Sequence, residues 1–402
     1  MEWRSCWPTG SGRDKLSEGM HLSMRTLVDP IAAVTSSNPG SIYGELTRHK
    51  ALVWSDAIEM WVAAHADVVR EVLAHPDCLV RPSGEPIPPR LIGTTAGVVF
   101  GRLARMNDGD YHNRGKRAIS RSLDSIALVQ LRADALHRST VIANQRDLSQ
   151  FGFEFPVHVI GHLLGVPDAE LQLLTNWTQA FVRCLVPAAT DDEVTTGIEG
   201  ADDLWNLFSE LLSKGDPPQF LASLAQALED AGVHGADAVI ANAIGLLFQT
   251  HDAAAGLIGN TIVHLSRHPQ ALDSSKPPES QARGIVAHVS HNDASIQNTR
   301  RFVANDATIA GRSVPAGDAI LVVLAAANDD EGIDSLSFGY GQHACPGRPI
   351  ALVITEVAVS ALLQRGLIPI ELPSPMLYQS STNARVPILD CPVQRPAMEN
   401  AR

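Results

Sequence analysis

The sequence predicts a mainly α-helical protein with small β-sheets. Its longest apolar helical pattern covers residues 236–266, and at ~1.5 Å per residue a helix of that length could cross a whole molecule. A second apolar helical pattern, residues 349–363, follows a glycine-rich loop around Cys345. The strand patterns are short, as in residues 51–54 and 60–64. Helices therefore dominate the expected fold.

The sequence also predicts shorter helices, strands and loops along the rest of the chain. Residues 51–54 and 60–64 are expected to form a hairpin, and residues 93–101, which include many small side chains, are expected to form a loop. Loops are also expected at 82–101 and 171–188, and residues that line a pocket are expected to come from them. The remaining expected elements are helices at 39–48, 65–74, 110–122 (basic) and 153–166, a strand at 325–328, and a strand turn at 309–317.

Composition limits the kinds of function. With 402 residues the chain can bury a core large enough to enclose a cofactor. The net charge of −13 argues against a nucleic-acid partner, and no apolar run of about 18 residues is present to cross a membrane. Five scattered cysteines without a CxxC pair fit a reducing cytoplasm. Residues 1–25 lack an apolar signal core and are expected to be disordered, with Met20 or Met24 as an alternative start, and residues 26–402 form the expected domain.

The stretch around Cys345 carries most of the functional information. A cysteine flanked by glycines and followed by a helix suits a thiolate ligand to a heme iron. The glycines let the backbone approach a flat macrocycle, and the helix N-terminus stabilises the thiolate. The fixed positions of this pattern, F-G-x-G-x-H-x-C-x-G, are Phe338, Gly339, Gly341, His343, Cys345 and Gly347.

This pattern resembles the heme-binding signature of the cytochrome P450 superfamily, and every fixed position matches. The resemblance implies a single large helical domain that encloses heme b (iron protoporphyrin IX), with Cys345 as the metal ligand. It extends from about residue 39 to residue 392 but is specific only in the heme loop. By the same resemblance, His112, Lys116, Arg301 and His343 would hold the heme propionates, with lysine in place of the usual arginine at 116.

The 236–266 pattern resembles the family's distal helix. Gln249 and Thr250 stand where the family has a small Ala-Gly pair, Asp252 matches the acid, and Ala253 replaces the usual threonine. In the family the acid and the hydroxyl deliver protons to oxygen. The relay is incomplete here unless Thr250, His251, a water molecule or the substrate completes it. His251 is expected to point toward a neighbouring helix.

Two departures concern the proximal core. The family's Glu-x-x-Arg pair should fall at His288 and His291, where neither residue is present. Only residues 329–337 separate Asn328 from Phe338, where the family has a segment about three times as long. His288 and His291 could alternatively be metal ligands, and His158 and His162 have the spacing of a zinc-protease pair but lack its glutamate.

The leading functional hypothesis is a heme-thiolate monooxygenase that oxidises a small organic molecule, expected to be a secondary metabolite. A ferredoxin and a ferredoxin reductase would supply electrons, and the protein is expected to be a cytoplasmic monomer. One alternative is a heme-thiolate enzyme with other chemistry: peroxide-driven oxidation, coupling, rearrangement or dehydration. Another is a degenerate family member that acts as a non-catalytic partner.

Overall fold

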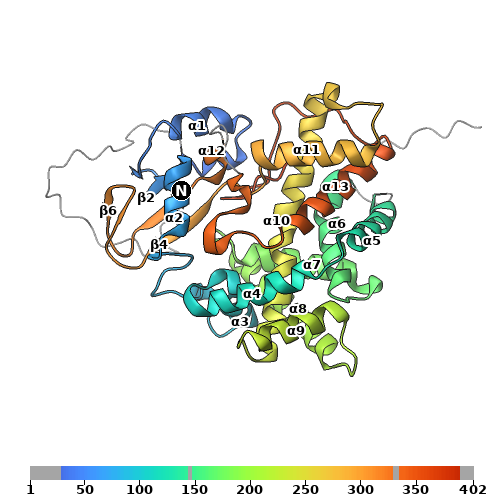
Figure 1. Cartoon of the computed structure of the whole chain (residues 1–402), viewed down its shortest axis with the longest axis horizontal. Coiled ribbons are helices and arrows are strands. Elements are labelled where there is room, and N and C mark those ends of the chain that lie inside the picture. The colour runs from blue at the N-terminus through green and yellow to red at the C-terminus, as the bar shows by residue number, and fades with distance from the viewer. Residues whose placement is uncertain (1–28, 144–146, 329–334, 390–402) are drawn as a thin grey trace, which may run out of the picture.

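A computed structural model describes residues 29–143, 147–328 and 335–389. The expected disorder of residues 1–25 lies outside this range. The described chain forms a large helical region beside a small five-stranded sheet (Figure 1). The fold is therefore mainly α-helical with small sheets, as the sequence predicted.

The helices vary widely in length. Their bounds are α1 Pro39–Leu46, α2 Ala66–Ala74, α3 Thr95–Arg102, α4 Gly109–Asp124, α5 Leu128–Ile142, α6 Leu148–Leu163, α7 Leu171–Cys184, α8 Asp191–Ser213, α9 Gln219–Asp230, α10 Ala236–Arg267, α11 Pro278–Asn292, α12 Leu324–Ala327 and α13 Arg348–Gln364. α10 is buried along most of its length and packs against α3, α6, α7, α8, α9, α11 and α13. It therefore runs through the helical region as its central element (Figure 1).

The sheets lie at one side of the molecule. The strands are β1 Val53–Ser55, β2 Met60–Ala63, β3 Cys78–Leu79, β4 Thr299–Val303, β5 Ala307–Ile309, β6 Arg312–Val314 and β7 Ala319–Val322. The five-stranded sheet has the order β1-β2-β7-β4-β3, in which only β2 and β7 run parallel, and β5 pairs with β6. The sheet thus joins N-terminal strands to those that precede the Cys345 loop.

Three local predictions were wrong. Residues 95–102 are helix α3 rather than a loop, because the Thr94 side chain caps it and Gly97 lets it pack tightly on the Leu91 carbonyl. Residues 324–327 are helix α12, since the strand ends earlier, at Val322. Most of the predicted loop at 171–188 is helix α7, which buries Leu171, Leu174 and Phe181.

No helix among the described residues is both long enough and apolar enough to span a lipid bilayer. The described residues also contain no group of three or more His, Cys, Asp or Glu side chains arranged to hold a metal ion. His288 instead packs against His264 of α10, with ring centroids 5.0 Å apart. The alternative metal-ligand reading of the histidine pairs therefore has no support in this part of the chain.

Candidate functional site

The loop around Cys345 is closed by its own backbone. The Cys345 N–H donates to the Phe338 carbonyl at 2.8 Å, and the Ala344 N–H donates to the Gly341 carbonyl at 3.1 Å. Gly339 has a φ of 75°, and a Cβ there would lie 3.3 Å from the His343 carbonyl oxygen. Only glycine suits both the conformation and the space, which explains why the motif requires it.

Cys345 lies deep in the molecule, yet its side chain keeps accessible surface. Burial raises the pKa of the thiol, while hydrogen bonds from the backbone N–H groups of Gly347 and Arg348, at the start of α13, lower it. The positive charges of Arg105 and Lys116 also lower it. These groups stabilise a thiolate, the form that binds iron.

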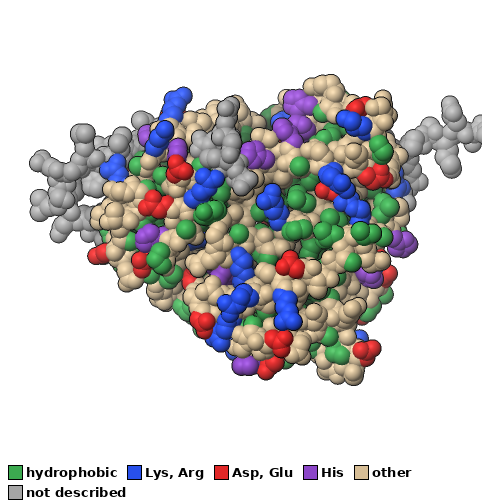
Figure 2. All heavy atoms as spheres, in the orientation of Figure 1, with side chains coloured by type: hydrophobic (Ala, Val, Ile, Leu, Met, Phe, Trp, Pro, Cys, Tyr) green, Lys and Arg blue, Asp and Glu red, His purple; other side chains and the backbone are tan. Residues whose placement is uncertain are grey.

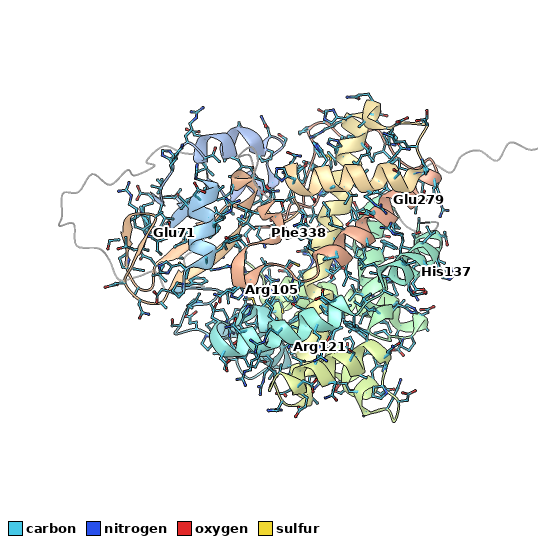
Figure 3. All side chains as sticks on the ribbon, viewed as in Figure 1. Glu71, Arg105, Arg121, His137, Glu279 and Phe338 are labelled. Atoms are coloured by element: carbon cyan, nitrogen blue, oxygen red, sulfur yellow. The ribbon has the colours of Figure 1, made fainter. Side chains whose placement is uncertain are left out.

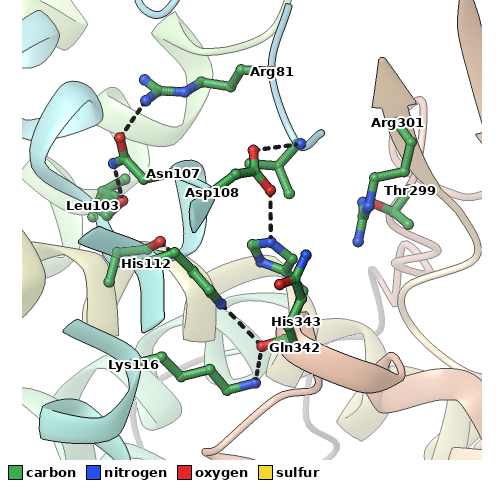
Figure 4. A network of polar contacts seen from close by, with 12 residues as sticks. Arg81, Leu103, Asn107, Asp108, His112, Lys116, Thr299, Arg301, Gln342 and His343 are labelled. Atoms are coloured by element: carbon green, nitrogen blue, oxygen red, sulfur yellow. Dashed lines mark hydrogen bonds and ion pairs between the residues drawn. The ribbon is translucent and has the colours of Figure 1, made fainter. Parts of the chain in front are cut away.

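Two residues of α4 lie against the backbone of the heme loop. The Lys116 ammonium donates to the carbonyls of Gln342 and Ala344, the second at 2.6 Å. The His112 ring joins the carbonyls of Ala104, at 2.8 Å, and Gln342, at 3.0 Å. Both contacts converge on Gln342 (Figure 4). α4 therefore holds the heme loop in place through polar contacts with its carbonyls.

Arg301 and His343 approach the same region from other elements (Figure 4). Arg301 is buried on β4, and its Nε has no hydrogen-bond partner among the described residues. Burial lowers the pKa of Arg301 to about 10, while Asp108 and Cys78 oppose this shift and Arg105 adds to it. The His343 Nε2 lies 3.0 Å from Asp108. Burial lowers the pKa of His343, while the contact with Asp108 opposes this shift.

The predicted distal residues lie on one stretch of α10. The Gln249 amide donates to the Gly245 carbonyl and the Thr250 hydroxyl to the Leu246 carbonyl, both at 2.7 Å. The buried His251 packs against Phe153 of α6, and its Nδ1 lies 2.7 Å from Asp252. Ala253 brings no polar group. Gln249 and Thr250 therefore direct their donors to their own helix, and Asp252 contacts His251.

Sequence reasoning missed two residues of this region. Arg105, just before α4, lies deep in the molecule and its charge acts on Cys345. The sequence around Arg105 matches no motif, so sequence reasoning had no signal for its position near the cysteine. Asn328 is buried and makes three hydrogen bonds, to the His291 carbonyl, the Ser337 hydroxyl and the Leu336 N–H. Asn328 thus joins the end of α11 to the segment that enters the heme loop, beside the positions where the Glu-x-x-Arg pair is missing.

The residues present fit a heme. The accessible thiol of Cys345, supported by backbone N–H groups, suits an axial sulfur ligand. The buried Arg301 Nε lacks a partner among the described residues, as expected of a donor awaiting an anion such as a propionate. Lys116, His112 and His343 lie within the same network (Figure 4). The donor set therefore matches both the iron and the acidic edge of the macrocycle.

No protein-family model matches the chain. A 20-oxo-5-O-mycaminosyltylactone 23-monooxygenase from Streptomyces fradiae is 26% identical over 85% of this chain and 86% of its own length. The cytochrome P450 monooxygenase PikC from Streptomyces venezuelae is 27% identical over 76% of this chain and 78% of its own. The crystal structure of CalO2 has a TM-score of 0.77 at 20% identity and covers 91% of this chain and 97% of that protein.

The chain belongs to the cytochrome P450 superfamily. Further solved structures agree in fold, among them P450BioI in complex with an acyl carrier protein bearing hexadec-9Z-enoic acid, with a TM-score of 0.75 at 20% identity over 87% of this chain and 97% of that protein. As a P450 it is an enzyme, like its curated monooxygenase relatives. The predicted family and fold are thereby confirmed, while the roles of individual residues stay predictions.

Proposed function

We propose that this P450 is a heme-thiolate monooxygenase that oxidises a small secondary metabolite. The observation that carries the proposal is Cys345, whose thiol is accessible and is supported by the N–H groups of Gly347 and Arg348. The monooxygenase relatives support the reaction class, and the name of the Streptomyces fradiae enzyme specifies a glycosylated lactone as its substrate. We propose heme b as the cofactor, which when bound supplies oxygen activation.

The proposed roles follow the positions of the side chains. Cys345 would hold the iron, and the buried Arg301 would bind a propionate. The Nη1 of Arg301 donates to the Arg300 carbonyl at 2.7 Å, while its Nε has no partner among the described residues. Lys116 and His112 fix the loop through the Gln342 carbonyl and add positive charge beside it. Asp252 is the proposed proton donor, held by His251, which in turn packs on Phe153. We propose a monomer in the cytoplasm.

Electrons would arrive from a ferredoxin at the face formed by α4. Lys and Arg side chains gather there (Figure 2), around a hollow of about 680 Å³ lined by Lys116, Arg117, Arg121 and Gln342. Arg114 is paired with Asp110 at 2.7 Å and Arg121 with Asp230 at 3.4 Å, so neither is a free charge. Arg117 is exposed, and no described residue pairs with it. It is therefore the best candidate to contact an acidic partner.

The ligand assignment is tested by the spectrum of the reduced protein with carbon monoxide. Thiolate ligation gives a red-shifted Soret band, which we expect for the parent and expect to be lost in Cys345→Ala. Cys184→Ala is the matched control, since Cys184 is buried on α7 away from the heme loop and burial raises its pKa to about 12. A Soret band that stays unchanged in Cys345→Ala refutes the assignment.

A second candidate function is heme-thiolate chemistry without oxygen insertion. Ala253 supplies no hydroxyl, and Gln249 and Thr250 already donate to carbonyls of α10. Asp252 is then the remaining acid, engaged with His251. Oxygen uptake coupled to product formation with a ferredoxin system favours the monooxygenase. Turnover with peroxide alone favours the second candidate.

A further inference from the structure

His251 is buried on α10 at the place where this helix packs against α6. Its ring contacts that of Phe153 on α6, with the ring centroids 4.7 Å apart and the ring planes inclined by 33°. A Cβ at Gly152 would be in van der Waals contact with the Ala255 carbonyl oxygen, at 3.8 Å, so the two helices approach closely beside this contact. Packing between α6 and α10 therefore fixes the place and the tilt of the His251 ring.

The two ring nitrogens of His251 have different surroundings. Nδ1 lies 2.7 Å from Oδ1 of Asp252, which is the distance of a charge-assisted hydrogen bond. Nε2 is buried and has no hydrogen-bond partner among the described residues. A neutral imidazole has one nitrogen that donates and one that accepts, and the hydrogen bond of one nitrogen decides the state of the other.

These surroundings select one of the two neutral forms of the ring. With the proton on Nε2, a buried donor would lack an acceptor, and the Nδ1 lone pair would face a carboxylate oxygen. With the proton on Nδ1, the ring donates to Asp252 and only an acceptor stays unpaired. Buried donors without a partner are the rarer of the two in proteins. The geometry therefore favours the form with the proton on Nδ1.

The two side chains also differ in their access to solvent. The His251 side chain is 3% exposed, whereas that of Asp252 is 38% exposed. Oδ1 of Asp252 is engaged by the ring, and its Oδ2 has no hydrogen-bond partner among the described residues. A proton can therefore reach Asp252 directly, but it cannot enter through the buried Nε2 of His251.

We propose that His251 is a positioning residue whose Nδ1–H holds Oδ1 of Asp252, so that Asp252 gives up and regains its proton through Oδ2 alone. In this step the Oδ2–H bond breaks as the proton passes to its acceptor in the site, and water returns a proton to Oδ2. The N–H bond of His251 neither forms nor breaks. The proposal rests on the proposed function, in which Asp252 is the proton donor.

The form of the ring can be measured without turnover. In protein labelled with ¹⁵N-histidine, correlations between the ring carbon protons and the ring nitrogens show which nitrogen carries the proton. The reduced carbon monoxide complex is diamagnetic and suits this measurement, and the His251 signals are those that disappear in His251→Asn. We expect the proton on Nδ1. A proton on Nε2, or on both nitrogens, overturns the proposal.

Two variants test the role of the hydrogen bond. His251→Asn places an amide N–H near the position of Nδ1, whereas His251→Phe keeps an aromatic ring beside Phe153 without a donor. Loss of one hydrogen bond to a charged group corresponds to about a tenfold change. We expect His251→Phe to lower kcat by about that factor with KM nearly unchanged, and His251→Asn to restore most of the loss.

The control is His137→Phe, the same replacement at an exposed position on α5, at the edge of the molecule (Figure 3). It should leave kcat unchanged. The proposal is overturned if His251→Phe turns over at the parental rate, or if His251→Asn loses as much activity as His251→Phe. A parent that lacks the red-shifted Soret band with carbon monoxide refutes the proposed function instead, and the ring nitrogens still show whether His251 donates to Asp252.

Discussion

The heme loop and the distal stretch of α10 differ in how they are built. In the loop, most of the hydrogen bonds involve backbone groups. The Cys345 N–H donates to the Phe338 carbonyl, and the carbonyls of Gln342 and Ala344 accept hydrogen bonds from the Lys116 ammonium. On α10 the polar atoms belong to side chains, and those of Gln249 and Thr250 return to carbonyls of their own helix. The loop keeps every position of the family pattern, whereas the helix departs from it at Gln249, Thr250 and Ala253.

This difference indicates which half of the site can vary. A loop that depends on glycine conformation and on backbone contacts tolerates few replacements. A helix keeps its shape when one side chain replaces another, so its chemistry can change without loss of the fold. We therefore expect changes at α10 to alter the reaction, and changes around the loop to alter heme retention and stability.

The largest effect is expected at Asp252. It is the acid left beside Ala253, and loss of a positioned proton donor costs about 10²–10⁴-fold in rate. Asp252→Asn keeps the shape and should lower product formation by that order while raising peroxide release. Asp252→Glu should retain part of the activity. Steady-state product and peroxide measurements check this, and a parental rate in Asp252→Asn would show that no relay passes through this residue.

Asn328 tests the loop side of the comparison. Asn328→Ala leaves the buried Leu336 N–H without its amide partner, and the His291 carbonyl loses a donor. An unsatisfied buried group costs about 1–3 kcal/mol. We expect a lower free energy of unfolding and faster heme release, with the rate per bound heme preserved.

The control for Asn328 is Asn305→Ala, which removes an exposed amide that bonds Asp77. Denaturant unfolding of both variants measures the difference. Equal stability of the two variants would show that Asn328 does not support the heme loop.

These contacts also show what the sequence could predict. The sequence predicts the glycine positions of the loop, the length of α10 and the β1–β2 hairpin. Backbone conformation and hydrophobic periodicity depend on local residue types, so these features can be predicted without the tertiary structure. The sequence predicts a loop where helix α3 lies, because the small residues of α3 serve close packing, which only the tertiary structure reveals. Arg105 could not be predicted, since Phe248 and Cys345, on which it acts, are distant in the chain. Asn328 could not be predicted either, because its bond to the His291 carbonyl spans 37 residues, although Leu336 and Ser337 lie nearby in the chain.

The substitution Ala253→Thr tests whether proton delivery by the side chains of α10 is impaired by the missing hydroxyl or follows a different route. If oxygen activation is merely impaired, the added hydroxyl should raise the product formed per reduced nicotinamide several-fold. We expect instead a neutral or harmful effect, because Gln249 and Thr250 also depart from the family pattern. Ala253→Val, which has nearly the same shape without the hydroxyl, is the control. A gain with Thr but not with Val would contradict our expectation.

The smallest effect concerns the surface of α4 beside the loop. Arg117 is exposed and has no partner among the described residues, so charge reversal there should not disturb the fold. Arg117→Glu should slow the first electron transfer from an acidic ferredoxin by a few fold at low salt, since steering follows the local charge. The difference should shrink as the ionic strength rises, because salt screens exposed pairs.

The control is Arg48→Glu, which makes the same charge change just after α1, away from α4 (Figure 1). Stopped-flow reduction at low and high salt separates the two variants. If both slow reduction equally, the protein's total charge rather than a docking surface on α4 governs the encounter.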